Sequence, residues 1–297
     1  MTDSASTSLT AYSDGPSGSR DFPFDLDDLA TPVGRPAEQR RVALLARALE
    51  SEVIPRLVLA RQNAAAPSYR DDRAIAPTAE DVRTLAEPVL RGDLQAAMAG
   101  VAALRARNLP LERIYLEVLA PVARLLGTMW QEDRCDFTAV TVGLCCLQQL
   151  LLENSGSFGP RPGRRDGHRR ILLAPVPGEQ HSFGLVMVGE FFRRQGWDVC
   201  SGTGASAREL VATTRKQWFS MIGLSMSCES RLQPLASLIH EIRRASRNPQ
   251  IGVLVGGGLF MEQPELATLV GADATATDGQ QAVLKAETLL ALLAPEA

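Results

Sequence analysis

In this chain of 297 residues, the clearest candidate for a chemically functional residue is a histidine between an acid and a glycine. Glu179, His181 and Gly184 follow an apolar run and precede a segment with helical periodicity. An imidazole can bind a metal ion through one ring nitrogen while a carboxylate holds the other. Because glycine has no side chain, Gly184 leaves room for a bulky group at the start of the helix. The spacing therefore predicts a metal-ligating histidine beside a large bound group.

Two further clusters of small residues follow later apolar runs of the C-terminal half. Ser225 and Ser227 come after one run, and a triple glycine comes after the next: Gly256, Gly257 and Gly258. The loop with the histidine also holds Ser182, directly before the helical segment. Parallel sheets bind ligands beyond the carboxyl ends of their strands. We therefore expect these three loops to converge on one site.

The elements that must position these loops alternate along the chain from residue 170 to 295. Strands are predicted at residues 170–176, 198–201, 221–225 and 250–255, and near Ala274. Helices are predicted at residues 183–195, 207–217, 232–245, 264–270 and 279–293. Strands that alternate with helices form a parallel sheet covered on both faces. The predicted fold is a doubly wound α/β domain of the Rossmann or flavodoxin type.

A helical bundle is predicted before this domain, over residues 78–154. Thr78 and Asp93 are suitable N-cap residues for its first two helices. The second helix is expected at residues 94–107, the third at 111–130 and the fourth at 138–153. Short connections between four helices are typical of a four-helix bundle. A basic, glycine-rich linker at residues 155–169 then marks the domain boundary.

The N-terminal part has a different composition. Residues 1–38 are rich in Ser, Asp, Pro and Gly, which is typical of a disordered tail. Residues 39–77 are expected to form one amphipathic helix, at 40–62, and a linker. The apolar stripe of that helix has no evident place in either domain. It could contact a partner, associate with a second copy or dock on the bundle.

Composition excludes several classes of function. Lys and Arg number 31 and Asp and Glu number 34, so the net charge of −3 argues against strong independent DNA binding. The longest uncharged run, residues 137–152, is shorter than the roughly 20 apolar residues that a membrane span needs. The N-terminus lacks the features of an export signal, so we expect a cytoplasmic protein. The five cysteines form no CxxC pair and are expected to be buried free thiols.

The motifs described above resemble those of the cobalamin-binding domain of methionine synthase and its relatives. That family has the pattern Asp-x-His-x-x-Gly, then Ser-x-Leu, then Gly-Gly, and the resemblance here extends over about residues 78–290. Two positions depart from the pattern, since Glu179 replaces Asp and Ser227 replaces Leu. The bundle in front of the domain resembles the cap that these proteins place over the upper face of the corrin.

The resemblance implies a role for each motif residue. His181 would coordinate cobalt from below in place of the cofactor's own benzimidazole, and Glu179 would hydrogen-bond the far nitrogen of the imidazole. Ser225 and Ser227 would meet the displaced nucleotide tail. The triple glycine would line the slot for that tail. The implied cofactor is cobalamin, in its hydroxo or adenosyl form.

Residues 121–148 are similar to the same segment of corrinoid caps, and especially to the AerR and PpaA antirepressors of purple photosynthetic bacteria. In that case Trp130 would lie over the upper corrin face, with ordinary bundle core as its alternative environment. The resemblance implies a light- or redox-responsive regulator of photosystem genes that is not an enzyme. Its partner would be a repressor of the CrtJ or PpsR type, with DNA contacted only through that repressor.

Two other readings remain open at this point. The chain could be a corrinoid methyl carrier of a methyltransferase system, although no catalytic partner domain is recognisable in it. It could also be a degenerate domain that has lost the cofactor and kept the fold. The neighbouring genes would discriminate between the carrier and the regulator, since methyltransferase genes favour the carrier and photosystem genes favour the regulator.

Overall fold

A computed structural model describes residues 76–158 and 168–293 of the chain. The strands of its parallel sheet are β1 (Arg170–Pro175), β2 (Asp198–Ser201), β3 (Met221–Ser225), β4 (Gly252–Gly256) and β5 (Ala274–Thr275). They pair in the order β2-β1-β3-β4-β5, which is the flavodoxin-like order. Pro175, Ser225 and Gly256 are in register across three adjacent strands. The loops that follow β1, β3 and β4 therefore begin side by side.

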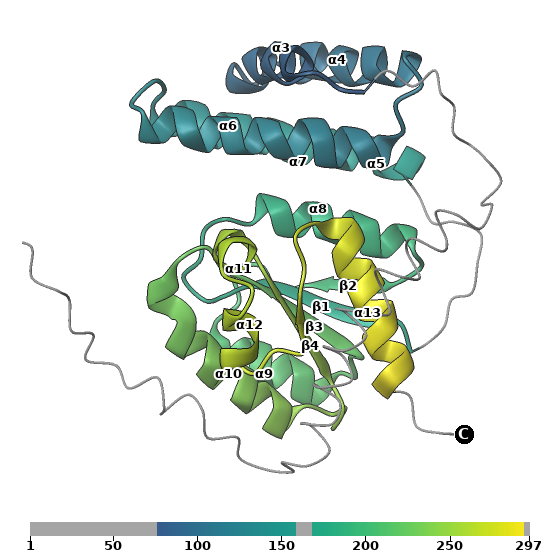
Figure 1. Cartoon of the computed structure of the whole chain (residues 1–297), viewed down its shortest axis with the longest axis vertical. Helices are drawn as coiled ribbons and strands as arrows, with labels where there is room; N and C mark the ends of the chain where they lie inside the picture. The colour runs from purple at the N-terminus through teal and green to yellow at the C-terminus, as the bar shows by residue number, and fades with distance from the viewer. Residues whose placement is uncertain (1–75, 159–167, 294–297) are drawn as a thin grey trace, which may run out of the picture. The chain divides into compact units, whose positions relative to one another are not determined.

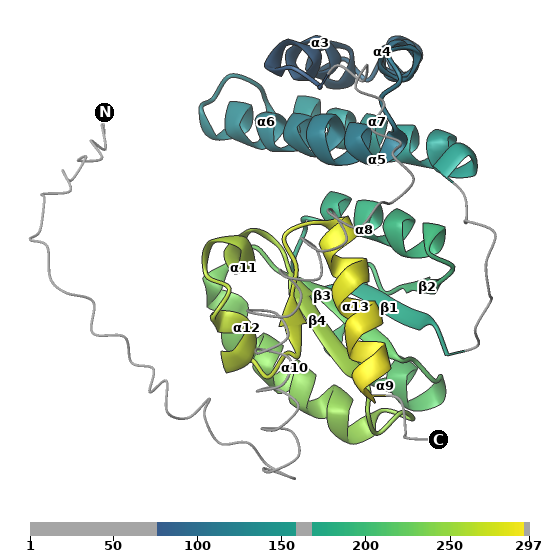
Figure 2. The ribbon, with the colours of Figure 1, turned by 45° about the vertical axis from the view of Figure 1, so that its right-hand side comes forward.

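Helices cover both faces of this sheet (Figure 1). The helices α8 (Phe183–Arg194) and α13 (Gly279–Leu293) pack on one face, and α9 (Ala207–Lys216) and α10 (Leu232–Ala245) pack on the other (Figure 2). Alternation along β1 explains why both faces are apolar, since Ile171 joins the core beneath α8 while Leu172 joins the core beneath α9. The doubly wound α/β fold predicted from the sequence is confirmed.

The segment after β4 differs from the prediction. A short helix, α11 (Gly258–Glu262), begins directly at the triple glycine, and α12 (Leu266–Leu269) covers only the middle of the helix expected at residues 264–270. Leu259 and Phe260 of α11 are buried in the core beneath α9 and α10. Because glycines are poor helix formers, no local pattern predicts α11, and tertiary burial overrides that propensity.

The predicted helical bundle is present as helices α3 (Ala79–Leu90), α4 (Leu94–Ala106), α5 (Leu111–Ile114), α6 (Ala120–Gln131) and α7 (Phe137–Phe158). We call residues 79–158 the helical layer. Thr78 forms a capping box with Asp81, and the Asp93 side chain accepts a hydrogen bond from the Ala96 N–H at 3.0 Å. Both N-caps predicted from the sequence are therefore confirmed.

A π-helical turn, η3 (Tyr115–Leu119), joins α5 to α6 where the sequence predicts one uninterrupted helix. Pro121 stands at the start of α6 and has no N–H to donate to the preceding turn. Widening that turn lets the N–H of Ala120 bond instead to the carbonyl of Tyr115. The π turn thus accommodates a proline within a long helix.

The last helix of the bundle, α7, continues to Phe158, beyond the end predicted near residue 153. Asn154 Nδ2 donates to the carbonyl of Leu150 at 2.8 Å, and Ser155 Oγ donates to Glu190 of α8 at 2.9 Å. These contacts keep residues 154 and 155 in the helix, although the local sequence favours a turn there. Residues 159–167 of the predicted basic linker lie outside the described residues.

The helical layer packs against α8 through both apolar and charged side chains. Tyr115 meets Phe191 in an edge-to-face contact with ring centroids 6.4 Å apart, and Arg194 forms an ion pair with Glu112. Apolar residues of both parts form one continuous buried core. The helix that begins directly after the His181 loop is therefore also the helix on which the helical layer rests.

The expected tail at residues 1–38 and the helix at 40–62 lie outside the described residues. Over residues 76–158 and 168–293, no helix has both the length and the apolar character of a bilayer span. All five cysteines are free, but only Cys146 is buried. The prediction of buried thiols is thus wrong for the other four, which lie at loops, helix surfaces and the edge strand: Cys135, Cys145, Cys200 and Cys228.

Candidate cofactor-binding site

The loops after β1 and β3 meet at the carboxylate of Glu179. Its Oε1 lies 2.6 Å from Nδ1 of His181 and accepts hydrogen bonds from the backbone N–H groups of Gln180 and His181. Its Oε2 accepts from the backbone N–H of Ser227 at 2.8 Å and from the Ser227 hydroxyl at 2.6 Å. The acid and the histidine expected to cooperate are therefore in direct contact.

The environment of Glu179 keeps it ionised. Burial of the carboxyl group, whose side chain is 4 % exposed, would by itself raise its pKa. The hydrogen bonds from the Ser227 hydroxyl and from the backbone N–H groups of His181 and Ser227 outweigh that effect and lower the pKa of Glu179 from 4.5 to about 2. A charged acceptor therefore faces His181 Nδ1 at neutral pH, which favours the tautomer with the proton on Nδ1.

The other side of the imidazole is open. The side chain of His181 is 76 % exposed, and Nε2 has no hydrogen-bond partner among the described residues. Gly184 is exposed in the first turn of α8, and a Cβ added there would meet nothing within 4 Å. The site therefore combines an accessible nitrogen ligand with free space at the adjacent helix, as a large planar group would need.

The triple glycine has two different functions in the structure. Gly257 has φ +106°, and a Cβ there would collide with the backbone of Met226, so this position requires glycine to pack β4 against the loop after β3. A Cβ on Gly258 would meet nothing within 4 Å, and one on Gly256 would make only an ordinary contact. Only Gly258 thus leaves open space of the kind expected for the cofactor slot.

The remaining serines lie where the sequence predicts, Ser225 and Ser227 at the end of β3 and Ser182 directly before α8. The carbonyl of Ser225 accepts the N–H of Val176 at 2.9 Å, and its hydroxyl has no hydrogen bond among the described residues. Ser182 precedes α8 without a capping side-chain hydrogen bond. Both hydroxyls are free to bind another group. Ser227, by contrast, is engaged with Glu179, a contact that its position two residues after the strand did not reveal.

Trp130 lies at the end of α6 and is 49 % exposed. Its alternative interpretation as buried bundle core is therefore wrong. A second exposed aromatic that was not predicted as a site residue is Phe137, which begins α7 and is 68 % exposed. A signal for it was available, because Asp136 caps α7 by accepting the Ala139 N–H at 2.7 Å, which puts Phe137 in the first turn. Two large aromatics thus flank the α6–α7 turn without being buried.

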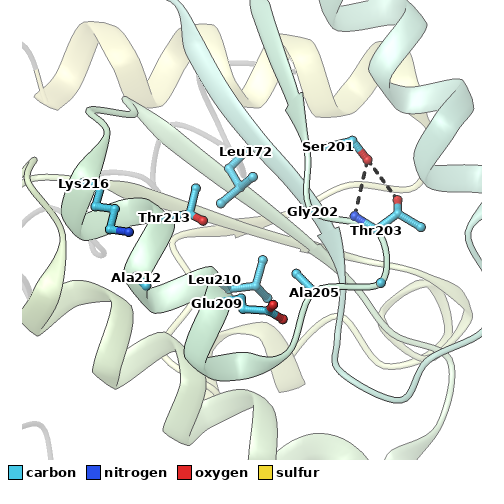
Figure 3. A pocket seen from close by; sticks show the side chains of 11 residues that line it. Leu172, Ser201, Gly202, Thr203, Ala205, Glu209, Leu210, Ala212, Thr213 and Lys216 are labelled. Atoms are coloured by element: carbon cyan, nitrogen blue, oxygen red, sulfur yellow. Dashed lines mark hydrogen bonds between the residues drawn. The ribbon is translucent and has the colours of Figure 1, made fainter.

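A separate pocket of about 480 Å³ lies between the end of β2 and α9 (Figure 3). Glycines, hydroxyls and one residue of each charge line it, with Glu209 and Lys216 on α9. The Glu209 carboxylate is already used, because it accepts the N–H and hydroxyl of Ser206 in a capping box. None of the predicted site residues lines this pocket, which opens on the α9 side of the sheet.

Comparison with known proteins agrees with this geometry. Residues 169–286 match the family model of the B12 binding domain. An uncharacterised 20.5 kDa protein of the bchF-crtJ intergenic region of Rhodobacter capsulatus is 29 % identical over 183 residues, which cover 59 % of this chain and 90 % of that protein. A dimethylamine corrinoid protein of Methanosarcina barkeri is 28 % identical over 154 residues, covering 52 % of this chain and 68 % of the relative. The α/β part of the chain is therefore similar in sequence to the B12 binding domain and to corrinoid proteins.

A solved structure supports the fold assignment. The monomethylamine corrinoid protein of Methanosarcina barkeri superposes with a TM-score of 0.59 at 12 % sequence identity, covering 72 % of this chain and 98 % of that protein. At this identity the likeness shows a shared fold. The matched share of this chain is larger than the 118 residues of the family match, 169–286.

Proposed function

We propose that this protein binds cobalamin with His181 as the lower cobalt ligand. The observation that carries the proposal is the clamped imidazole. The ionised Glu179 holds Nδ1 at 2.6 Å, while Nε2 is left open to solvent beside the empty space at Gly184. A neutral imidazole oriented through its second nitrogen by a carboxylate is the usual form of a histidine metal ligand.

Each neighbouring group then has a definite task. Glu179 orients the imidazole and makes it a stronger donor, and Ser227 fixes the carboxylate from the neighbouring loop. The free hydroxyls of Ser182 and Ser225 and the open space at Gly258 receive the polar tail of the cofactor. A bound corrin would supply a cobalt centre whose upper ligand can be exchanged by light or by a change of redox state.

The biological role that we propose is regulation without catalysis. The chain would act as a light- or redox-responsive antirepressor that binds a CrtJ- or PpsR-type repressor of photosystem genes. Two observations support this role. The relative from Rhodobacter capsulatus is named for its position beside crtJ. The exposed Trp130 also offers a flat surface that can respond to the upper ligand, and helices packed on α8 can carry such a response outward.

A corrinoid methyl carrier is the second candidate function. It is favoured by the similarity to dimethylamine corrinoid proteins of three Methanosarcina species, at 26 to 28 % identity. A carrier and a regulator bind the same cofactor, so the corrin site alone does not separate them. The two proposals differ in the partner and in the use of the upper ligand.

The decisive experiment loads the purified chain with hydroxocobalamin, methylcobalamin or adenosylcobalamin and measures two outputs in the dark and after illumination. The regulator proposal expects retention of the coloured cofactor on desalting and repressor binding that changes with illumination or upper ligand. Transfer of the methyl group from the methylcobalamin-loaded chain to a thiol acceptor in the presence of a methyltransferase, with no effect on the repressor, would favour the carrier. Failure to retain any of the three cofactors would contradict both.

A further inference from the structure

Arg231 connects the two loops of the site at a second point. It ends the short helix η4 (Glu229–Arg231) in the loop after β3. Its Nη1 donates a hydrogen bond to the carbonyl of Pro177, at a distance of 3.0 Å, in the loop after β1. The two loops are therefore joined twice, by Ser227 to Glu179 and by Arg231 to Pro177.

The contact is shaped by Gly178, which lies between Pro177 and Glu179. A Cβ at this position would lie 3.1 Å from the Arg231 Cζ and 3.3 Å from Nη2, and closer still to Nη1. Gly178 also has φ +85°, a conformation that other residues rarely adopt. The guanidinium group thus covers a glycine whose missing side chain makes the approach possible.

No acid explains the placement of this arginine. Within the described part of the chain, Arg231 forms no ion pair, and its Nε is buried without a hydrogen-bond partner. A buried N–H donor without a partner is unfavourable by itself. The one hydrogen bond that its guanidinium makes there ends on the loop that carries His181. The arginine therefore contacts the loop that carries His181 although one of its own donors is left without a partner.

We propose that Arg231 is a positioning residue for the cobalt ligand, an inference that rests on the proposed binding of cobalamin. Glu179 fixes the orientation of the imidazole ring, while Arg231 fixes the backbone from which Glu179 and His181 extend. Because the loop is held at Pro177, the backbone of His181 is already ordered before the cofactor binds to Nε2. Preorganisation of this kind raises affinity because less conformational freedom is lost on binding.

The test compares Arg231→Met with Arg231→Lys in the full chain. Methionine keeps much of the side-chain length and removes the donors, whereas a lysine ammonium can still reach the Pro177 carbonyl. We expect Arg231→Met to bind hydroxocobalamin about tenfold more weakly and to lose part of the absorption signature of histidine ligation. Arg231→Lys should recover both. Gly178→Ala should also weaken binding, both because the added methyl group displaces the guanidinium and because alanine is strained at φ +85°.

Arg243→Met is the matched structural control. Arg243 also donates to backbone carbonyls, those of Ile251 and Gly271, but it lies at the opposite end of the strands and pairs with Asp273. The Arg243→Met substitution should lower thermal stability while leaving the ligation spectrum unchanged. If Arg231→Met folds and gives the parent spectrum and affinity, the positioning role is wrong. If Arg231→Met does not fold, Arg231→Ala, which also removes the donors, replaces it in the comparison with Arg231→Lys.

The outcome also separates this inference from the proposed function. A parent protein that shows no histidine-ligated spectrum refutes cobalamin binding through His181, and Arg231 then has no ligand to position. A parent with that spectrum and an Arg231→Met variant indistinguishable from it leaves the proposed function intact. That result refutes only the positioning role of Arg231.

Discussion

Nδ1 of His181 lies 2.6 Å from a Glu179 oxygen, and the side chains have opposite exposures, 76 % for the histidine and 4 % for the acid. The buried member is fixed by the neighbouring loop, and the exposed member is free to bind. The glutamate is longer than the aspartate of the related motif, but its carboxylate still reaches both His181 and Ser227. The substitution therefore preserves the contact that orients the imidazole.

Replacing His181 with Ala should abolish retention of cobalamin on desalting, because the proposed cobalt ligand is removed. The measurement is the visible spectrum and the cobalt-to-protein ratio after gel filtration. His240→Ala is the control, since His240 is also exposed but lies on α10. A His181→Ala protein with the parent's spectrum and stoichiometry would show that the ligand assignment is wrong.

Replacing Ser227 with Ala should destabilise the protein in a pH-dependent way. Loss of a hydrogen bond to a buried carboxylate typically costs about 1.5 to 3 kcal/mol. The pKa of Glu179 is lowered from 4.5 to about 2 in the folded state, so its stabilising effect is complete above pH 4.5 and is lost as the pH falls toward 2. The difference in unfolding free energy between parent and variant should therefore be largest at neutral pH and shrink below pH 4.5.

Urea unfolding at several pH values measures this difference. Ser230→Ala is the matched control, because the Ser230 hydroxyl contacts Cys228 in the same loop and does not touch Glu179. It should show a small effect with no such pH dependence. An equal and pH-independent loss in both variants would contradict the role assigned to Ser227.

Trp130→Ala should change the preference between hydroxocobalamin and adenosylcobalamin. The side chain is half exposed, so its removal should cost much less than the about 3 to 5 kcal/mol typical of a buried aromatic. Binding titrations with the two cofactors and a thermal melt measure both quantities. Leu152→Ala removes another exposed apolar side chain, on α7, and should leave the preference unchanged. Equal shifts for both cofactors would indicate a general loss of binding.

The strands and their carboxyl-end loops could be predicted from the sequence because both are local signals. The bounds of β2 and β3 agree with the apolar runs at residues 198–201 and 221–225. The Glu179 and His181 spacing likewise places both residues in one loop. The contact of Glu179 with Ser227, 48 positions away, follows only from the parallel pairing of β1 with β3.

Other features depend on contacts that no local pattern contains. The continuation of α7 past Asn154 depends on Glu190 of α8, and the π turn depends on how Pro121 is fitted into a packed helix. Arg231 resembles any surface arginine in the sequence, because its partner is a backbone carbonyl 54 residues away. Only the fold brings that carbonyl within reach.

Asp81→Asn should destabilise the helical layer by about 1 to 2 kcal/mol, since it weakens an N-terminal capping box and a hydrogen-bonded ion pair. Asp81 accepts from Thr78 and from both Nη atoms of Arg107, at 2.5 and 3.2 Å. The hydrogen bond from Arg107 is the main reason why the pKa of Asp81 falls from 3.8 to about 2. The stabilisation should disappear as the pH drops from 3.8 toward 2.

Glu80→Gln provides the comparison for this stability measurement. Glu80 pairs with Arg83 at the surface, where ion pairs typically contribute about 0 to 1 kcal/mol. Thermal unfolding should therefore separate the two variants clearly at neutral pH. A similar loss in both would mean that the cap and the Arg107 contact contribute little to the helical layer.

Removing residues 1–62 should weaken binding to the repressor while cobalamin binding survives. The proposed cofactor site is built from loops of the α/β domain, whereas the apolar stripe predicted at residues 40–62 is our candidate for the contact with the partner. A net charge of −3 gives the full chain little independent attraction to DNA, so the repressor should carry the sequence specificity. Pull-down of a CrtJ- or PpsR-type repressor, with cofactor retention measured on the same samples, tests the division of roles. Unchanged repressor binding by the truncated chain would show that the contact lies in the helical layer or the α/β domain. Tight sequence-specific DNA binding by the isolated protein would contradict action through the repressor.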